Sequence, residues 1–259
     1  MVIIVTGATG AIGSAAVEQL RALGHTVIGT SRRAEHEGFR SLDVSSPASI
    51  EAFVQGLEAD GIRIDGLLNN AGTQLPHYET TPEGFERVIA TNYLGPYLLT
   101  RRLLPLMNPD AHVVNTVSLS CYVAHLDPDF LHPNPDKYRQ IGTYANSKMA
   151  VMLFSEELHR RYGEHITVHV TDPGIVNSRI LHLNRWFDPI ADLVFRPFCK
   201  SPKKGAKPAI HALLFKANYG NPLFLFRGDR HLSVPHRWQH PNTSRWLWNE
   251  TEELLKNYL

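Results

Sequence analysis

Hydrophobic and polar positions along this chain follow two alternating spacings. Short apolar runs that end at glycine or polar residues predict buried strands at 2–5, 25–30, 65–69, 111–117 and 165–171. Between them, apolar residues repeat at helical spacing and predict helices at 11–23, 47–57, 82–107 and 142–162, with another helix starting near 201–205. Strands that alternate with helices in this way are typical of βαβ units and a parallel sheet.

This order predicts an α/β fold, a Rossmann-type doubly wound parallel sheet flanked by helices. The 259 residues are enough for one sizeable core, and no linker or internal repeat divides them. We therefore expect a single domain over 1–259.

Composition narrows the class of protein. The net charge is +1 with no basic arm, which argues against a nucleic-acid partner. The two cysteines, Cys121 and Cys199, indicate a reducing compartment without a disulfide, and no cluster of cysteine and histidine predicts a metal site. No run approaches the roughly 20 apolar residues of a membrane span, and no signal peptide is apparent. These features predict a cytoplasmic protein without a transmembrane segment.

A glycine-rich turn joins the first strand to the first helix. Backbone amides and the helix N-terminus at such a turn can bind a pyrophosphate. The residues predicted to do so are Gly7, Thr9, Gly10, Ala11, Ile12 and Gly13. The alternative is an ordinary turn, which the strand–turn–helix context disfavours.

The end of the second strand bears on the choice of cofactor. An acid there would bind a ribose 2′-hydroxyl, but this strand ends in Ser31, Arg32 and Arg33. Arginine can instead bind a 2′-phosphate through charge and a bidentate fork. The sequence favours NADP(H) over NAD(H), unless both arginines are ordinary surface residues.

Tyr144 and Lys148 share one face of a predicted helix. A positive charge near a phenol stabilises the phenolate, and such a phenol can exchange a proton with a substrate oxygen. Taken alone, the pair is more often a surface pair.

Several further motifs follow one another along the chain in a specific order. The glycine turn, Asn69-Asn70-Ala71-Gly72, Ser118, Tyr144-x-x-x-Lys148 and Asp172-Pro173-Gly174 resemble those of the short-chain dehydrogenase/reductase family over nearly the whole chain. The long interval from Ser118 to Tyr144 and the tail from 244 to 255 resemble its retinol dehydrogenase and protochlorophyllide reductase-like subgroup.

The resemblance implies catalytic roles for four residues. Tyr144 would be the acid/base, and Lys148 would hold the nicotinamide ribose and lower the tyrosine pKa. Ser118 would polarise the substrate oxygen, and Asn92 would position a proton-relay water. Ser120 takes the serine role if the loop alignment slips by two, and Asn92 has the alternative of bonding its own backbone.

The resemblance also implies further cofactor contacts. Asp43 and Val44 would lie at the adenine, although Asp43 could instead cap the following helix. Asn70, Ala71 and Gly72 would lie beside the adenosine ribose. The loop under the nicotinamide would use Pro173, Gly174, Val176 and Ser178.

Two segments lie outside these motifs. The segment at about 177–204 would form a substrate lid, in which 186–198 is either a wall for an apolar substrate or a core or subunit-contact helix, and peripheral membrane attachment is a weaker alternative. A C-terminal extension covers about 220–259. Family members often form homodimers or homotetramers through the two long helices, which this extension could alter.

The leading hypothesis is an NADP(H)-dependent oxidoreductase that transfers a hydride between nicotinamide and a small-molecule carbonyl or alcohol, with an apolar substrate. Reduction of a carbon–carbon double bond belongs to the same class. The alternatives are a redox sensor that binds NADP(H) without turnover and an extended-branch enzyme of nucleotide sugars. The intact Tyr–Lys–Ser–Asn set argues against the sensor, and the Asn69–Gly72 motif argues against the extended branch.

Overall fold

The computed structural model describes residues 1–33, 37–176, 199–216 and 222–259. Eight strands form one sheet in the order β3-β2-β1-β4-β5-β6-β7-β8. All neighbouring pairs are parallel except β7 and β8. The predicted doubly wound parallel sheet in a single domain is confirmed. The strands are β1 (Val2–Val5), β2 (Thr26–Ser31), β3 (Phe39–Ser41), β4 (Ile64–Asn69), β5 (Met107–Thr116), β6 (Thr167–Asp172), β7 (Phe224–Arg227) and β8 (Arg230–Ser233).

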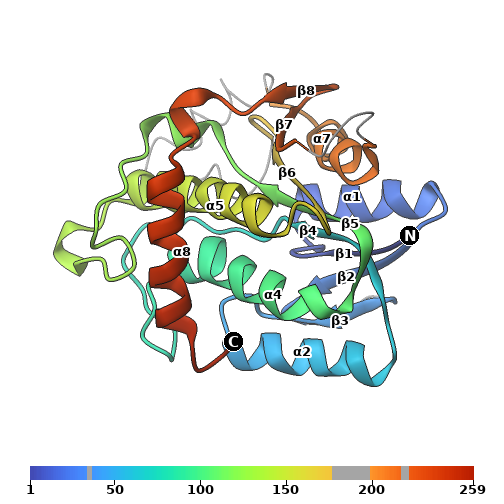
Figure 1. Ribbon diagram of the computed structural model, residues 1–259, viewed down its shortest axis with the longest axis horizontal. Coiled ribbons are helices and arrows are strands. Elements are labelled where there is room, and N and C mark those ends of the chain that lie inside the picture. Colours follow the sequence, from blue (N-terminus) through green and yellow to red (C-terminus); the bar gives the residue numbers. More distant parts are fainter. Residues whose placement is uncertain (34–36, 177–198, 217–221) are drawn as a thin grey trace.

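Helices cover both faces of the sheet (Figure 1). They are α1 (Ala11–Ala22), α2 (Pro47–Ala59), α3 (Arg87–Ile89), α4 (Gly95–Leu103), α5 (Gln140–Tyr162), α7 (Pro202–Leu214) and α8 (Pro241–Leu255). On β1, Ile4 packs into the core under α2, α4 and α5, while Ile3 and Val5 pack into the core under α1 and α7. Because both faces are buried, the strand is apolar throughout instead of alternating.

The predicted helix at 82–107 is wrong at both ends. It begins at Arg87 because the Glu86 carboxylate accepts hydrogen bonds from the amides of Val88 and Ile89. After a π-helical turn at Ala90–Leu94, α4 ends at Leu103, and a short 3₁₀ turn that contains Pro105 leads into β5 at Met107. Proline cannot continue the hydrogen-bond pattern of the helix, which shortens it.

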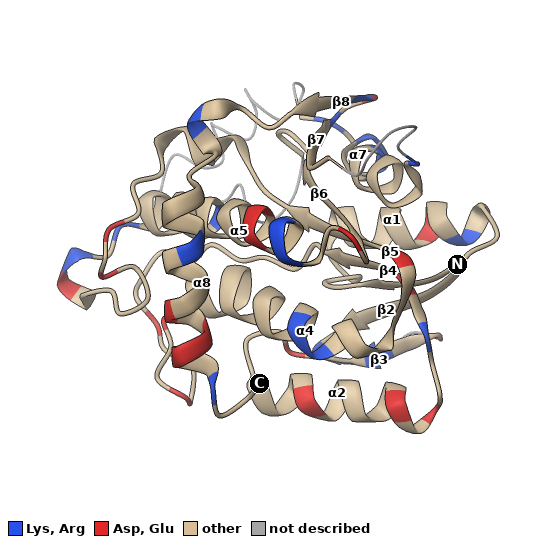
Figure 2. Cartoon of the chain, viewed as in Figure 1, with Lys and Arg blue, Asp and Glu red and all other residues tan. Residues whose placement is uncertain are grey.

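The C-terminal extension supplies β7, β8 and α8. Helix α8 packs across α4 and α5, where buried Trp248 lies 5.0 Å from Tyr97 and 5.9 Å from Phe154 between ring centroids. Both signs of charge occur on α5 and α8, and α4 is basic (Figure 2); Arg101 of α4 pairs with Glu252 of α8. Helix α8 therefore covers a face shared by the two long helices.

Candidate active site

The predicted site residues gather at the carboxyl ends of the parallel strands. Thr6 follows β1, and its Oγ1 accepts hydrogen bonds from the amides of Asn70 (2.9 Å) and Ala71 (3.0 Å), which follow β4. Asn70 returns a bond from its Nδ2 to the Thr6 carbonyl at 2.9 Å. These bonds join the glycine turn to the Asn70–Gly72 turn, as ligand sites at the switch point of such sheets require.

Close packing explains two of the glycines. Gly7 has φ +64°, and a Cβ there would lie 3.0 Å from the Ala71 Cα. A Cβ on Gly13 would lie 2.3 Å from the Gly7 carbonyl oxygen. A side chain at Gly7 would collide with the turn after β4, and one at Gly13 would push α1 away from the glycine turn, so glycine is needed at both.

The N-terminus of α1 offers the donors that a pyrophosphate needs. No side chain caps the helix, and no acidic residue occupies its first turn. Within the described chain, no acceptor faces the amides of Ala11, Ile12 and Gly13. Thr9 and Gly10 are exposed beside them. This donor set fits the diphosphate of a dinucleotide.

The end of β2 is arranged around two exposed arginines. Ser31 Oγ donates to the Arg33 carbonyl, and Ser41 Oγ donates to the Arg32 carbonyl at 3.3 Å. These bonds shape the backbone that carries both guanidinium groups. Asp43 lies nearby, and its Oδ1 accepts from the Ser45 amide and hydroxyl.

Asp43 does not cap the next helix. The Ser46 side chain caps α2 instead, accepting from the Ser49 amide. Buried Val44 presents its carbonyl to Gly95, where an added Cβ would lie 2.0 Å from that oxygen. Asp43 and Val44 thus lie beside β2, the strand next to β1 and its glycine turn. Neither residue caps α2.

Asn92 lies in the π-helical turn and is 1 % exposed. Its Oδ1 accepts from the Thr73 amide at 2.7 Å, and its Nδ2 donates to the Thr73 carbonyl and to Ser147 Oγ, both at 2.9 Å. The alternative in which this side chain bonds its own helix backbone is wrong. Pro96 has no N–H for the Asn92 carbonyl, which favours the widened turn.

Ser118, Tyr144 and Lys148 meet between β5 and α5. The Ser118 side chain lies close enough to the Tyr144 phenol to lower its pKa. The Lys148 ammonium lies 5.9 Å from the Tyr144 ring centroid and donates to the Thr116 carbonyl at 2.9 Å. Ser120 Oγ is buried without a hydrogen-bond partner in the described chain. The geometry therefore brings Ser118, not Ser120, to the phenol.

The turn after β4 joins this group to Asn92. A Cβ on Gly72 would lie 3.5 Å from Asn92 Oδ1 and 3.6 Å from Lys148 Nζ. All four residues expected to be catalytic thus lie around one place at the carboxyl edge of the sheet.

Comparison with known proteins decides the family. Residues 1–186 match the model of the short chain dehydrogenase family. The chain belongs to this family. It is a hydride-transfer oxidoreductase of the kind that uses a nicotinamide dinucleotide, as its site geometry also indicates.

The relatives of this short-chain dehydrogenase match it over most of its length. Retinol dehydrogenase 12 of Bos taurus is 32% identical over 98% of this chain and 86% of its own length. Polyprenol dehydrogenase of Mus musculus is 34% identical over 82% of this chain and 70% of its own length. A crystal structure of an uncharacterized protein from Mycobacterium paratuberculosis is 27% identical, with a TM-score of 0.78 over 98% of this chain and 93% of that one. The resemblance to the retinol dehydrogenase-like subgroup is confirmed.

Burial sets the pKa values in the dehydrogenase site. It raises the pKa of Tyr144 to about 12, against the opposing effect of the nearby Ser118 hydroxyl. It lowers the pKa of Lys148, which is 4 % exposed, to about 8. The lowering of the tyrosine pKa by Lys148 stays a prediction, since the causes that raise the Tyr144 pKa are burial and the neighbouring Cys121 and Asp172. Tyr144 is therefore a protonated donor at neutral pH.

The loop after β6 contains the predicted nicotinamide contacts. Gly174 has φ +72°, and its amide donates to Asp172 Oδ1 at 2.9 Å. Buried Val176 pairs as a parallel bridge with Lys200. Ser178 and the predicted wall at 186–198 lie outside the described residues, as does 177–198 of the predicted lid. At the described end of the predicted lid, the Ser201 side chain caps α7, which begins at Pro202.

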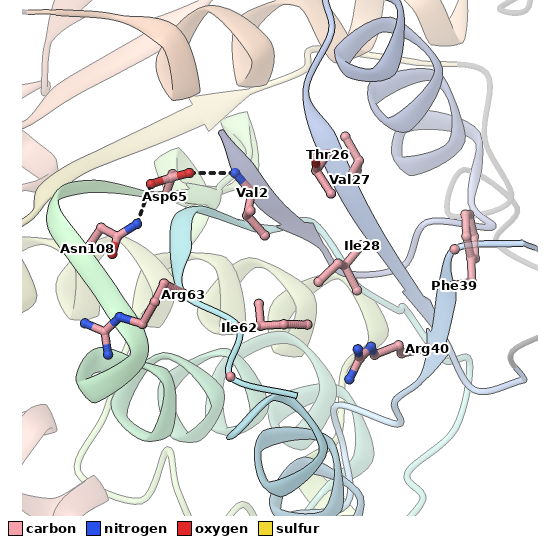
Figure 3. Close-up of a pocket in the computed structure, with 12 residues that line it drawn as sticks. Val2, Thr26, Val27, Ile28, Phe39, Arg40, Ile62, Arg63, Asp65 and Asn108 are labelled. Atoms are coloured by element: carbon pink, nitrogen blue, oxygen red, sulfur yellow. Dashed lines mark hydrogen bonds between the residues drawn. The ribbon is translucent and has the colours of Figure 1, made fainter. Parts of the chain in front are cut away.

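A cavity of about 620 Å³ lies elsewhere (Figure 3). It is bordered by Val2, Thr26, Asp65 and Asn108, which stand at or next to the amino ends of their strands. Asp65 accepts hydrogen bonds there from the Val2 amide at 2.6 Å and from Asn108 at 2.7 Å. Because the catalytic groups lie at the opposite strand ends, this cavity is not the reaction site.

Sequence reasoning missed a buried polar network behind the site. Asn69 Nδ2 donates to Asn115 Oδ1 at 2.8 Å and to Thr100 Oγ1 at 3.0 Å, and Asn115 Nδ2 donates to Ser155 Oγ at 2.8 Å. The network ties β4 and β5 to α4 and α5. The feature of the sequence that could have indicated this network is Asn115, a polar residue inside a largely apolar predicted strand.

Proposed function

We propose that this short-chain dehydrogenase is an NADP(H)-dependent enzyme that interconverts an apolar alcohol and its carbonyl compound, with Tyr144 as the general acid/base. The observation that carries this proposal is the buried Lys148 ammonium, 5.9 Å from the Tyr144 ring centroid, with the Ser118 hydroxyl beside the same phenol. A phenol held in this way can give a proton to a substrate oxygen that reaches both hydroxyls.

The proton steps follow from these groups. When bound, the nicotinamide supplies or accepts the hydride at the substrate carbon. In the reductive direction, the Tyr144 phenol donates its proton to the oxygen on which negative charge develops, and Ser118 stabilises that charge by hydrogen bonding. Lys148 stabilises the phenolate that remains. In the oxidative direction, Tyr144 accepts the hydroxyl proton, and its pKa of about 12 means that the phenol must first be deprotonated.

The preference for NADP(H) is supported by the end of β2. Arg32 and Arg33 are exposed directly after a strand whose last residue is Ser31. Two guanidinium groups without an acid at the strand end suit a 2′-phosphate and leave a 2′-hydroxyl without its usual acceptor.

An apolar substrate is supported by the surface around Tyr144. Leu119, Tyr122 and Val123 are exposed on the 3₁₀ turn after Ser118. Ile141 is exposed near the start of α5, and Ile175 is exposed beside Gly174. Exposed apolar side chains that gather in one region mark a binding surface for apolar ligands. The relatives' names, retinol and polyprenol dehydrogenase, also refer to apolar alcohols.

Nucleotide titration tests the cofactor. In a titration monitored by nucleotide fluorescence, we expect NADPH to bind more tightly than NADH. Arg32→Ala should abolish this preference. Arg245→Ala, at an exposed position on α8, is the matched control. Equal affinities in the wild type would refute the cofactor assignment.

Turnover of retinal and other apolar aldehydes then tests the substrate class, and activity only on small polar carbonyls would refute it. The cytoplasmic location stays a prediction that cell fractionation can check; within the described chain, no helix is long and apolar enough to cross a membrane.

A further inference from the structure

Strands β6 and β7 end side by side in a buried ion pair. Asp172 and Arg227 are register partners at the ends of these parallel strands. Arg227 Nη2 lies 3.0 Å from Asp172 Oδ2, with side-chain exposures of 31% and 3% respectively. A carboxylate that is so fully buried is retained in a fold when a cation and hydrogen bonds compensate its lost hydration.

The other oxygen of the same carboxylate shapes the loop that follows. Asp172 Oδ1 accepts the Gly174 amide at 2.9 Å, and Gly174 has φ +72°. The carboxylate is thus held from two sides, by the guanidinium of β7 and by the turn it stabilises. If the guanidinium were removed, the carboxylate would lose its fixed orientation and with it the geometry of the Gly174 turn.

This pair also borders the catalytic group. The Asp172 charge acts on Tyr144, Lys148 and Cys121, the titratable groups that face it from α5 and from the turn after β5. On the other side of the loop, Lys200 Nζ donates to the Pro173 carbonyl at 3.4 Å. Among the described residues, Arg227 is the cation that contacts the carboxylate directly, and it comes from a strand that carries none of the residues expected to be catalytic.

We propose that Arg227 is a positioning residue for the nicotinamide half of the cofactor. By holding Asp172, it fixes the Gly174 turn on which that half would rest. This inference rests on the proposed function, because it assumes that the loop after β6 faces the nicotinamide. Arg227 acts through Asp172 and touches neither cofactor nor substrate in this role.

The first test needs no cofactor. Amide hydrogen exchange is measured in a peptide that spans Gly174, for wild type, Arg227→Met and Arg227→Lys. We expect faster exchange in Arg227→Met and near wild-type exchange in Arg227→Lys, which keeps the charge. Arg230→Met is the matched control, because Arg230 is exposed on the same hairpin. Unchanged exchange in Arg227→Met would overturn the proposal.

The second test separates the two halves of the cofactor. We expect Arg227→Met to bind the whole dinucleotide about tenfold more weakly, which corresponds to about 1.4 kcal/mol. Binding of adenosine 2′,5′-bisphosphate or 5′-AMP, which lack the nicotinamide half, should not change. A purely structural defect would weaken the binding of the dinucleotide and of the fragment alike, or it would reduce only the fraction of protein molecules that can bind. Equal loss for fragment and dinucleotide would therefore refute the positioning role.

A double variant covers the case in which Arg227→Met does not fold. Asp172→Asn with Arg227→Met buries no unpaired charge and keeps an oxygen for the Gly174 amide. We expect it to fold, with Gly174 exchange and dinucleotide affinity still impaired; wild-type values for both would overturn the proposal. A wild type that binds dinucleotide but turns over no substrate would refute the proposed reaction and leave Arg227 testable by binding. A wild type that binds no dinucleotide would refute both.

Discussion

Asn69 and Asn115 face each other across β4 and β5, and the Asn69 amide donates to the Asn115 side-chain oxygen at 2.8 Å. Asn115 is fully buried, and its own amide donates to Ser155 on α5. This contact connects the strands that carry the Asn70–Gly72 turn and Ser118 to the helix that carries Tyr144. Buried polar side chains thus connect the elements that carry the residues expected to be catalytic.

Replacing Asn115 by leucine should destabilise the protein. The change leaves the amide of Asn69 and the hydroxyl of Ser155 without these partners, and we expect a loss of about 3 kcal/mol in the free energy of unfolding. Urea denaturation followed by circular dichroism measures this. Gln55→Leu, at an exposed position on α2, should change stability by less than about 0.5 kcal/mol. Equal effects of the two substitutions would show that the network contributes nothing particular.

Replacing Tyr144 by phenylalanine should abolish the proton step. We expect kcat to fall roughly 10²- to 10⁴-fold with nucleotide affinity retained, because only the hydroxyl is lost. Steady-state kinetics with the substrate found for the wild type measures this. Tyr258→Phe, which removes a hydroxyl from an exposed tyrosine near the C-terminus, is the control. Full turnover by Tyr144→Phe would rule out Tyr144 as the acid/base.

The pH dependence of reduction should report on Lys148. Burial lowers its pKa to about 8, so the ammonium is present below that pH and is lost above it. Tyr144, with a pKa near 12, stays protonated over the same range. We expect kcat/KM for reduction to fall above about pH 8, and Lys148→Arg to move that fall to higher pH. A profile that stays flat to pH 9.5 would contradict this assignment.

Acid should unfold the protein through His169. This residue is 1 % exposed, and burial, aided by the charges of His112 and His159, lowers its pKa to about 3. Because the folded pKa lies below the unfolded value of about 6.5, the neutral ring stabilises the fold above pH 6.5. That stability is lost as the pH falls toward 3, with a slope of up to about 1.4 kcal/mol per pH unit.

His169→Phe should remove much of this dependence. Phenylalanine suits the surrounding rings, since Phe224 and Phe226 lie 5.9 Å and 5.0 Å from His169 between centroids. Urea midpoints between pH 7 and pH 4 give the measurement, and His165→Phe, at an exposed position, is the control. An unchanged pH slope in His169→Phe would place the acid sensitivity in other groups.

The assembly expected from the family meets an obstacle in α8. Trp248 of this helix fills the space between α4 and α5, and Thr251 shares a 2.6 Å hydrogen bond with Tyr93. We expect the wild type to sediment as a single chain, because this face is already covered. Trp248→Ala should cost about 3–5 kcal/mol and promote concentration-dependent association. A stable wild-type dimer cross-linked through α4 and α5 would disprove this prediction.

Sequence patterns could predict what local chemistry determines. The apolar run of β1 and the glycines of the following turn indicated a strand, a tight turn and a packed helix, and all three are present. The three-residue β3 was not predicted, because a strand so short has no periodicity of its own. The false start of the long helix at 82 arose because the cap depends on the side chain of Glu86, which apolar spacing does not report.

Site residues were predictable where a motif is contiguous and not where the fold joins distant segments. Tyr144 and Lys148 are one helical turn apart, so their proximity follows from spacing. The pair of Asp172 with Arg227 joins residues on neighbouring strands that are far apart in sequence. Only the strand order of the sheet brings them together, and the sequence did not indicate where β7 would pair.

The antiparallel strand β8 also affects how molecules behave at high concentration. Among the described strands it ends the sheet with four exposed residues, Arg230, His231, Leu232 and Ser233, and the opposite edge is the three-residue β3. Brief edge strands with a charged side chain are poor templates for pairing with another chain. The described sheet thus offers another molecule no long exposed edge, which should limit strand-to-strand aggregation in a concentrated preparation.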